Sequence, residues 1–224
     1  MVSSTKHRIL DAAEELFAEQ GFSTTSLRHI TTRAEVNLAA VNYHFGTKHA
    51  LVAAVFARRL IPMNRDRLQR LDRLIAANAP HDPPLDALIE AFIAPALELS
   101  RDAAQGGARF IKLLGRSYTE PSAQLQEQIR EMYSEVIDRF RPVFAQVLPD
   151  LPSDELYWRL HFLVGVLAYC MSGADMMRLI ASCRVHDPLD TEMLTRRLSA
   201  FVTAGMRAAP PITDASRFPE TAHG

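Results

Sequence analysis

The sequence predicts an all-α fold with two parts: a small N-terminal bundle of three helices that contains a helix-turn-helix, and a larger helical domain after it. Apolar residues recur with helical spacing along nearly the whole chain of 224 residues. No run of alternating β-branched residues is long enough for a strand. The hydrophobic fraction of 48% is sufficient for one sizeable core or two modest ones.

The first predicted helix begins after Ser4 or Thr5, which suit an N-cap, and ends at Gly21, which suits the position that follows a helix. Phe22 is then expected to fold back as an apolar clamp. One face of this helix is apolar and consists of Ile9, Leu10, Ala13, Leu16 and Phe17.

A second helix begins after Thr25 or Ser26, and a third covers Leu38 to about His44, with Asn37 as its N-cap. About three residues form the turn between them. A helix as short as the third is not stable alone, so it must lie on the first two helices. The residues that anchor it are Val36, Val41 and Phe45. The second and third helices therefore form the helix-turn-helix.

The rest of the chain is also predicted to be helical. A fourth helix starts at the cap residue Thr47 and extends to about Asn78. Pro62 lies inside it and is expected to kink or end it, because proline lacks an N–H group. Pro95 and Pro142 are expected to bend two later helices. The later helices are predicted over 84–100, 105–118, 122–147, 153–182 and 189–208.

Composition limits the class of protein. The net charge of −1 excludes a uniformly basic nucleic-acid coat. The first 60 residues nevertheless hold seven Lys/Arg and five Asp/Glu, so a polyanion is expected to meet the N-terminal end. Cys170 and Cys183 are too few for a disulfide framework or a zinc cluster, which suits the reducing cytoplasm. No apolar run reaches the roughly 20 residues of a membrane span, and no signal peptide opens the chain.

An enzyme is not expected. The sequence has no Gly-rich phosphate loop, no H-E-x-x-H, no C-x-x-C and no G-x-S-x-G. Four histidines near the N-terminus lack metal-ligand spacing within one face, so neither a metal nor a cofactor is expected.

The third helix has the character of a DNA-reading helix, although plain packing of a helical hairpin is the alternative. In helix-turn-helix proteins the second helix of the motif enters the major groove, with its N-terminal residues nearest the bases. Leu38 and Ala39 can touch thymine methyl groups, and Asn42 can pair with adenine. The residues placed to meet phosphates are Tyr43, His44 and Lys48 on one side and Ser26 and Arg28 on the other. Packing of the tyrosine on the first helix is the alternative for that residue.

The segments "FAEQGF", "TTSLRHI" and "YHF-G-TK-AL" resemble the DNA-binding domain of the TetR family of transcription regulators over about residues 6–56. The stretches "VNLAAVNYHFGTK" and "FIKLLGRSYTEPS" are most similar to the PsrA-like, fatty-acid-responsive branch. The family's turn usually reads Ala-Gly-Val, and here it reads Ala34-Glu35-Val36. The glutamate puts a negative charge near DNA and strains the turn if its φ is positive.

The resemblance implies a homodimer that represses transcription from double-stranded operator DNA and is released by a small apolar effector, a long-chain fatty acid or acyl-CoA. It divides the chain into a DNA-binding domain over 1–47 and a ligand-binding and dimerisation domain over 48–208. The remaining residues, 209–224, are expected from their composition to form a disordered tail. The alternatives are a helical ligand-binding or scaffold protein without DNA binding, a drug-responsive regulator of the same fold, and an activator of the same build.

Residues 156–171 are apolar almost all round, so this helix must be covered on every side. In the family the last two long helices pair with their copies in a four-helix dimer interface. A large core within one chain would give the same sequence pattern. The residues expected in the interface are Leu160, Gly165, Leu194, Leu198 and Phe201.

The middle helices would build the ligand pocket. Its expected apolar lining consists of Phe92, Phe110, Leu113, Ile129, Met132 and Tyr133, for which plain core is the alternative. Arg109 and Arg116 lie two turns apart on one helix face and can neutralise a carboxylate or phosphate, unless they point to solvent. His161 is a third polar candidate, with a core histidine as the alternative.

Overall fold

The computed structural model describes residues 4–102, 106–119, 123–171 and 190–211. Every regular element in these ranges is an α-helix, which confirms the predicted all-α fold. The predicted helical segment 172–182 and the tail from 212 onward lie outside the described residues. The helices are α1 (Thr5–Gln20), α2 (Leu27–Ala34), α3 (Leu38–Phe45), α4 (Lys48–Asn78), α5 (Leu85–Arg101), α6 (Gly107–Thr119), α7 (Ala123–Val147), α8 (Ser153–Met171) and α10 (Thr191–Arg207).

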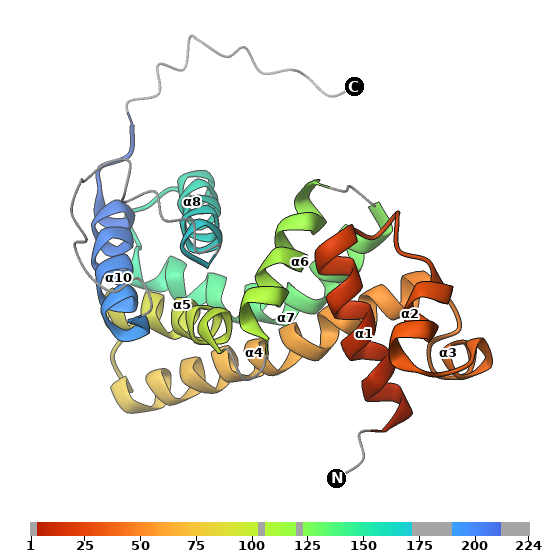
Figure 1. The fold of residues 1–224 in the computed structure, drawn as a ribbon. Helices are drawn as coiled ribbons and strands as arrows, with labels where there is room; N and C mark the ends of the chain where they lie inside the picture. Colours follow the sequence, from red (N-terminus) through yellow and green to blue (C-terminus); the bar gives the residue numbers. More distant parts are fainter. Residues whose placement is uncertain (1–3, 103–105, 120–122, 172–189, 212–224) are drawn as a thin grey trace, which may run out of the picture.

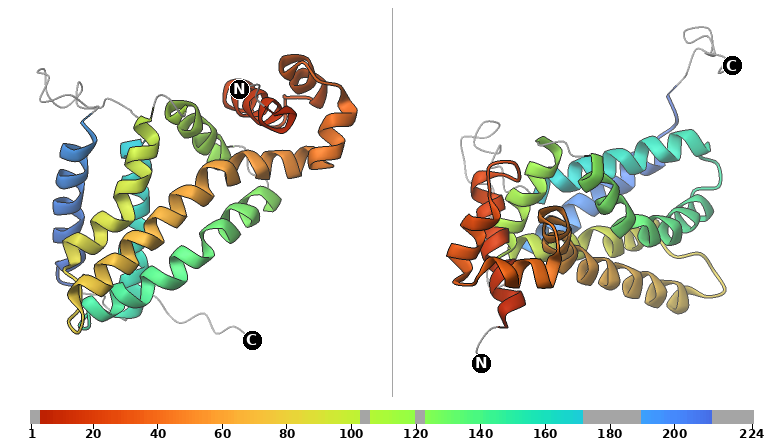
Figure 2. Two further views of the ribbon diagram at one scale, coloured as in Figure 1. Left: turned by 90° about the horizontal axis from the view of Figure 1, so that it is seen from below. Right: turned by 90° about the vertical axis from the view of Figure 1, so that its right-hand side faces the viewer.

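The molecule has two ends, which α4 connects. Helices α1, α2 and α3 cluster at one end, and α8 and α10 lie at the other (Figure 1). The view from below shows the same separation (Figure 2). The first part of α4 contacts α1 and α3, and its later part packs against α5 and α7. Helix α1 also packs against α6, so α4 and α6 together determine how the N-terminal cluster lies on the rest of the protein.

The N-terminal helices start where their caps predict. The Ser4 and Thr47 side chains accept hydrogen bonds from backbone N–H groups in the first turns of α1 and α4, and Asn37 accepts from the N–H of Ala40 at 2.8 Å. Gly21 follows α1 with a φ of 94°, a conformation that a side chain would oppose. These local signals set the bounds of the helix-turn-helix.

An aromatic cluster holds the N-terminal bundle together. The Phe22 ring centre lies 5.6 Å from that of Phe17 and 6.0 Å from that of Phe56, which confirms the predicted clamp. Val41 is fully buried under α3, and two partly buried residues, Val36 and Phe45, pack against the same core. The predicted anchoring of α3 is therefore confirmed.

Prolines do not interrupt the long helices. Helix α4 continues through Pro62, and α5 and α7 continue through Pro95 and Pro142. The expectation that Pro62 could end its helix is wrong. The buried residues Leu60 and Met63 on either side of it keep both halves of α4 on the same core, so the loss of one helical hydrogen bond is tolerated.

Helix α5 lies at the centre of the larger domain, where α4, α6, α8 and α10 pack around it. Its inward residues Leu88, Phe92 and Leu97 are almost completely buried. Within the described ranges, no helix is both long and apolar enough to cross a membrane.

Candidate nucleic-acid interface and interior site

The eight residues expected to contact DNA all lie at the surface of the N-terminal end. Ala39 and Asn42 are exposed, Leu38 is 44% exposed and Tyr43 is 85% exposed. Such exposure shows that Tyr43 does not pack on α1, so that alternative is wrong. The remaining four residues are Ser26, Arg28, His44 and Lys48, of which the first two are exposed and the last two partly buried.

Two of these side chains already make polar contacts within the chain. The Ser26 hydroxyl accepts a hydrogen bond from the N–H of His29 at 3.2 Å and so caps α2. The Lys48 amine donates to the Ser23 carbonyl oxygen at 3.4 Å. That bond is long and exposed, so a phosphate can replace it at little cost.

The backbone of the turn in the helix-turn-helix has a positive φ at Glu35, the case in which the sequence predicts strain. Glu35 adopts the left-handed conformation with φ 51° and ψ 49°. Its N–H donates to the Thr32 carbonyl at 3.3 Å, and the N–H of Val36 donates to the Thr31 carbonyl at 3.0 Å. These two bonds end α2 and reverse the chain toward α3. The glutamate therefore occupies a position that favours glycine.

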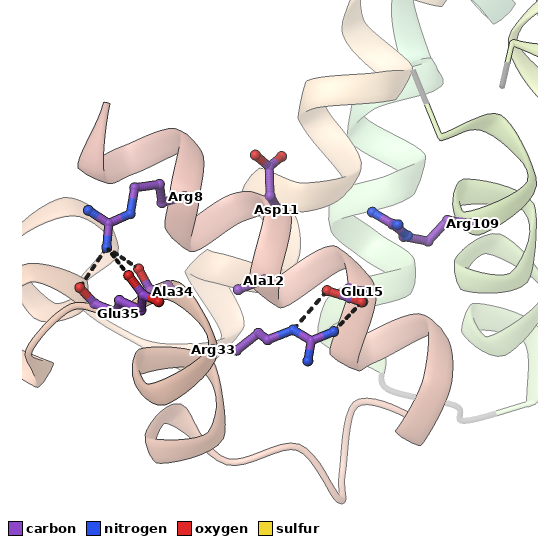
Figure 3. A pocket seen from close by; sticks show the side chains of 8 residues that line it. All are labelled: Arg8, Asp11, Ala12, Glu15, Arg33, Ala34, Glu35 and Arg109. Atoms are coloured by element: carbon purple, nitrogen blue, oxygen red, sulfur yellow. Dashed lines mark hydrogen bonds and ion pairs between the residues drawn. The ribbon is translucent and has the colours of Figure 1, made fainter. Parts of the chain in front are cut away.

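Arg8 on α1 stabilises this turn. Its guanidinium donates to the carbonyl oxygens of Ala34 at 2.5 Å and Glu35 at 2.6 Å, and lies 4.0 Å from the Glu35 carboxylate (Figure 3). The cation meets the free carbonyls and the negative end of α2. Sequence reasoning missed this residue, because a lone arginine on a polar helix face gives no local sign of a partner 26 residues away.

Replacing Glu35 with glycine is expected to raise the free energy of unfolding by up to about 1 kcal/mol. The left-handed conformation costs a residue with a side chain about 1–2 kcal/mol, and glycine avoids this cost. Part of the gain is lost because glycine gives up more chain entropy on folding. Urea unfolding measures the change. Glu35→Ala is the matched control, because it removes the carboxylate but keeps the Cβ. Equal stability of the two variants would show that the backbone conformation carries no cost.

An open polar cavity of about 310 Å³ lies beside this turn (Figure 3). Arg33 of α2 forms an ion pair with Glu15 of α1, and that hydrogen bond lowers the pKa of the Glu15 carboxyl below its ordinary value. Arg109 of α6 also lines the cavity. The cavity therefore lies between the N-terminal bundle and α6 and is lined by charges of both signs.

The position of Arg109 corrects the expectation that it faces the apolar interior. Its neighbour Phe110 is fully buried and lies 6.2 Å, ring to ring, from Phe56. Adjacent residues of a helix point about 100° apart, so Arg109 is left exposed on the outer side. The side chain of Arg116 lies outside the described residues.

The other expected pocket residues divide into two groups. Phe92 and Leu113 are buried, and Ile129, Met132 and Tyr133 are partly buried against the core. His161, in contrast, is exposed on α8, where its ring contacts those of Trp158 and Phe162. The apolar residues are therefore inside, but neither of the described polar candidates is beside them.

The interior polar site consists of two α4 residues that sequence reasoning missed. Arg67 is 2% exposed, and its Nε donates to the Phe92 carbonyl oxygen at 2.8 Å. Its Nη1 donates to the Asn64 side-chain oxygen at 3.0 Å, and the Asn64 amide donates to the Met132 carbonyl at 2.8 Å. Burial lowers the pKa of the Arg67 guanidinium below its ordinary value, against the opposing effect of Tyr133. The site joins α4, α5 and α7.

A signal for Arg67 was present in the spacing. The buried residues Leu60, Asn64 and Leu71 recur on the same stripe of α4, and Arg67 occupies the position between the last two.

At the opposite end of the molecule, α8 and α10 expose large apolar side chains. Trp158 is 58% exposed, Phe162 59% and Phe201 67%. A shallow groove of about 100 Å³ runs between the two helices. Its lining residues are Arg159, Phe162, Leu163, Val166, Phe201, Val202, Gly205 and Met206. This outer face has the character that a partner would cover.

The five residues expected in a dimer interface are placed differently. Phe201 and Gly165 are exposed, and no atom of the described residues lies within 4 Å of the position that a Gly165 Cβ would take. Leu160 and Leu194 are partly buried. Leu198 is 5% exposed, because α10 turns this side toward α5 of its own chain, so it belongs to the core.

A buried ion cluster connects α1 to α4. The Glu14 side chain is completely buried and binds the guanidinium groups of Arg58 and Arg59. Arg58 also pairs with Asp11 at 2.5 Å. The cluster fixes the N-terminal bundle on α4 just before Pro62.

Helices α2 and α3, joined by a short turn, and the exposed outer face of α3 define a helix-turn-helix protein. Residues 9–55 match the family model of bacterial regulatory proteins of the tetR family, and residues 90–205 match that of the tetracyclin repressor-like C-terminal domain. The protein belongs to the TetR family of bacterial regulatory proteins.

Two relatives illustrate the similarity. The HTH-type transcriptional repressor Rv3405c of Mycobacterium tuberculosis is 35% identical over 137 residues, which cover 60% of this chain and 57% of that protein. The HTH-type transcriptional repressor BepR of Brucella suis is 30% identical over 139 residues, which cover 62% and 63%. The chain thus matches little more than half the length of these relatives. The family and its matched members are transcriptional regulators and not enzymes, which agrees with the missing enzyme motifs.

Solved structures show the same fold. The fatty acid degradation regulator FadR from Bacillus halodurans has a TM-score of 0.66 at 12% identity, covering 93% of this chain and 100% of that one. The SmeT–triclosan complex has a TM-score of 0.59 at 23% identity, covering 89% and 91%. At these identities the likeness concerns the fold alone.

Proposed function

We propose that the protein is a homodimeric repressor that binds a pseudo-palindromic DNA operator and leaves it when an apolar effector enters the larger domain. The observation that carries the proposal is α3: a short helix anchored by Val41, with small and polar residues exposed along its outer face. A helix with small residues in its first turn can approach the floor of the major groove closely. Two copies would read half-sites about 34 Å apart or a multiple of this distance.

DNA contacts should separate into two classes. Replacing Lys48 with alanine is expected to weaken binding to all sequences alike and to flatten the salt dependence of log K by up to about one unit, because one phosphate contact is lost. Tyr43→Ala should act similarly, without loss of fold since that ring is 85% exposed. Asn42→Ala and Leu38→Ala are expected to change base preference instead.

Gel shifts with DNA from around the protein's own gene, repeated at several salt concentrations, test this assignment. His49→Ala is a matched surface control, because His49 is exposed one residue beyond Lys48. No binding of this DNA by the wild-type chain would favour the scaffold alternative, for which Glu35 is the structural support. A Lys48→Ala variant with altered base preference and unchanged salt dependence would overturn the assigned roles.

The exposed faces of α8 and α10 support the homodimer. Helices α8 and α10, which carry the exposed residues Phe162 and Phe201, lie at the end of the molecule away from α3 (Figure 1). A symmetric partner would cover the same face on both copies and leave both reading helices free. Gly165 is exposed, and among the described residues nothing lies within 4 Å of the position of its Cβ, so the surface there has room for a helix of the second copy.

We infer that the effector is a long-chain fatty acid or its acyl-CoA. The resemblance of the sequence to the PsrA-like branch supports this choice, as does the apolar region around Phe92 and Tyr133. Each buried CH₂ contributes about 0.8 kcal/mol, so a long chain binds well with few polar contacts. For release, the effector must bind the DNA-free conformation more tightly, because equal affinity for both conformations changes nothing.

A DNA-binding titration with oleate, oleoyl-CoA, octanoate and ethidium tests the effector class. Long-chain compounds are expected to lower DNA affinity, and octanoate should be far weaker because it buries fewer methylene groups. Release by ethidium alone would replace the lipid assignment with a drug-responsive regulator.

A further inference from the structure

The arginine buried in the larger domain lacks a counter-ion. Arg67 is 2% exposed, and its guanidinium donates to the Phe92 carbonyl and the Asn64 side-chain oxygen. It also interacts with the Tyr133 side chain, so none of these partners is a carboxylate. No carboxylate among the described residues forms an ion pair with it. The neighbouring arginines Arg59 and Arg70 each pair with an acidic side chain. Arg67 therefore differs from these two neighbouring arginines in having no acidic partner among the described residues.

A buried cation without a counter-ion is costly. Removing a charged group from water costs several kcal/mol, and neutral carbonyl partners recover only part of this. The guanidinium carbon also lies 4.5 Å from the centre of the Phe92 ring and 5.7 Å from that of Tyr133, so aromatic faces supply some compensation. An anion at this position would gain a charge-assisted bond in a setting with little competing water.

We propose that Arg67 binds the single negative charge of an amphiphilic effector, a carboxylate with an apolar tail, between α4, α5 and α7. This deepens the effector part of the proposed function and rests on it. The carboxylate would displace the Asn64 amide from the guanidinium, and the tail would lie along the apolar side chains near Tyr133. Asn64 also holds the Met132 carbonyl of α7, so its displacement would loosen α4 from α7.

The site distinguishes a free acid from its coenzyme A thioester. A thioester has no carboxylate, and its phosphates carry several charges that one enclosed guanidinium cannot neutralise. Among described residues, Arg67 is the arginine that is both buried to this degree and without an acidic partner. Arg109, which the sequence favoured, is exposed to solvent and lines the cavity beside α1 instead. The site thus narrows the proposed effector, given above as a fatty acid or its acyl-CoA, to the free monocarboxylate.

A structural role is the competing explanation. The Phe92 carbonyl accepts from Arg67 three residues before Pro95, where proline disturbs the helical hydrogen bonds of α5. On that view Arg67 only repairs the kink, and the charge of a ligand is irrelevant to its binding. The two explanations differ in whether the protein distinguishes an acid from its uncharged ester.

The experiment compares dansyl-undecanoate with its methyl ester by the rise in dansyl fluorescence on binding to the full chain. The wild-type protein is expected to bind the acid about ten-fold or more tightly than the ester, the range of one charge-assisted bond. Arg67→Met should remove this preference, so that acid and ester bind with equal affinity. Arg67→Lys should retain a preference for the acid. Arg109→Met is the matched control and should behave as the wild type.

Equal binding of acid and ester by the wild-type chain would overturn the proposal without any variant, so it remains testable even where Arg67→Met fails to fold. Loss of the preference in Arg109→Met rather than Arg67→Met would also overturn it. Release of DNA is measured in parallel with both probes. DNA release by both compounds with no acid preference would refute the role of Arg67 and leave the proposed function standing. Binding of neither compound, with no DNA release, would refute the fatty-acid effector together with this site.

Discussion

Replacing Glu14 with alanine is expected to lower the free energy of unfolding by about 3–5 kcal/mol, because it removes one partner of a buried ion pair and leaves charge behind. The Glu14 side chain has no exposed surface, and the side chains of Arg58 and Arg59 are only 19% and 14% exposed. Arg58 keeps Asp11 as a partner after the substitution, whereas the recorded ion pair of Arg59 is lost. The loss should also weaken the attachment of α1 to α4, which the Arg58–Asp11 pair and the aromatic cluster then maintain.

Urea unfolding of the full chain measures this effect. Glu15→Ala is the control, because Glu15 is the next residue of α1 and its partner Arg33 is 54% exposed. An exposed pair of this kind contributes only about 0.2–1 kcal/mol. Equal destabilisation by the two variants would show that burial does not determine the strength of the Glu14 cluster.

Replacing Phe162 with aspartate is expected to convert the proposed dimer to a monomer and to abolish operator binding. Phe162 is 59% exposed in the single chain, so the substitution should leave the fold intact. In a symmetric interface the substitution occurs once in each of the two subunits. The dimer therefore loses the burial of two phenylalanine side chains, which amounts to about 3–6 kcal/mol. That corresponds to a rise in the dimer dissociation constant of roughly 100-fold or more, before any repulsion between the new carboxylates.

Sedimentation and gel shift on the same preparations measure the two outcomes. Ile137→Asp on α7 is the matched control, since Ile137 is 45% exposed but does not line the groove between α8 and α10. It should leave both the dimer and DNA binding unchanged. A Phe162→Asp protein that stays dimeric would locate the interface on another face.

The helices and their bounds were predictable because their signals are local. A cap residue such as Asn37 or Thr47 acts within the next three residues, and apolar spacing is visible in a single stretch of sequence. The exposure of α3 followed in the same way from its length and from the apolar character of Val41. Local rules could not show that Glu14 binds arginines 44 and 45 residues away.

Periodicity shows which residues share a face but not which face is inside. The spacing of Arg109 and Arg116 was read as one face toward the pocket, yet Phe110 takes the inward position. Likewise, Leu198 and Phe201 on α10 were expected in one interface, and the structure turns the former toward α5 and the latter outward. Only the three-dimensional packing of neighbouring helices decides such cases.

In the proposed mechanism helix α4 would act as a lever, and its length would determine how sensitive DNA release is to the effector. Lys48, beside the reading helix, lies 14 residues before Pro62, which at 1.5 Å per residue is an arm of about 21 Å. A rotation of only about 10° at Pro62 moves the end of such an arm by about 4 Å. In the proposed dimer, opposite movements of two heads would change a spacing of about 34 Å by up to about 7 Å, more than the width of a minor groove of about 6 Å. In this mechanism a small displacement near Arg67 would therefore be sufficient to move both reading helices out of register with the major grooves of the two half-sites.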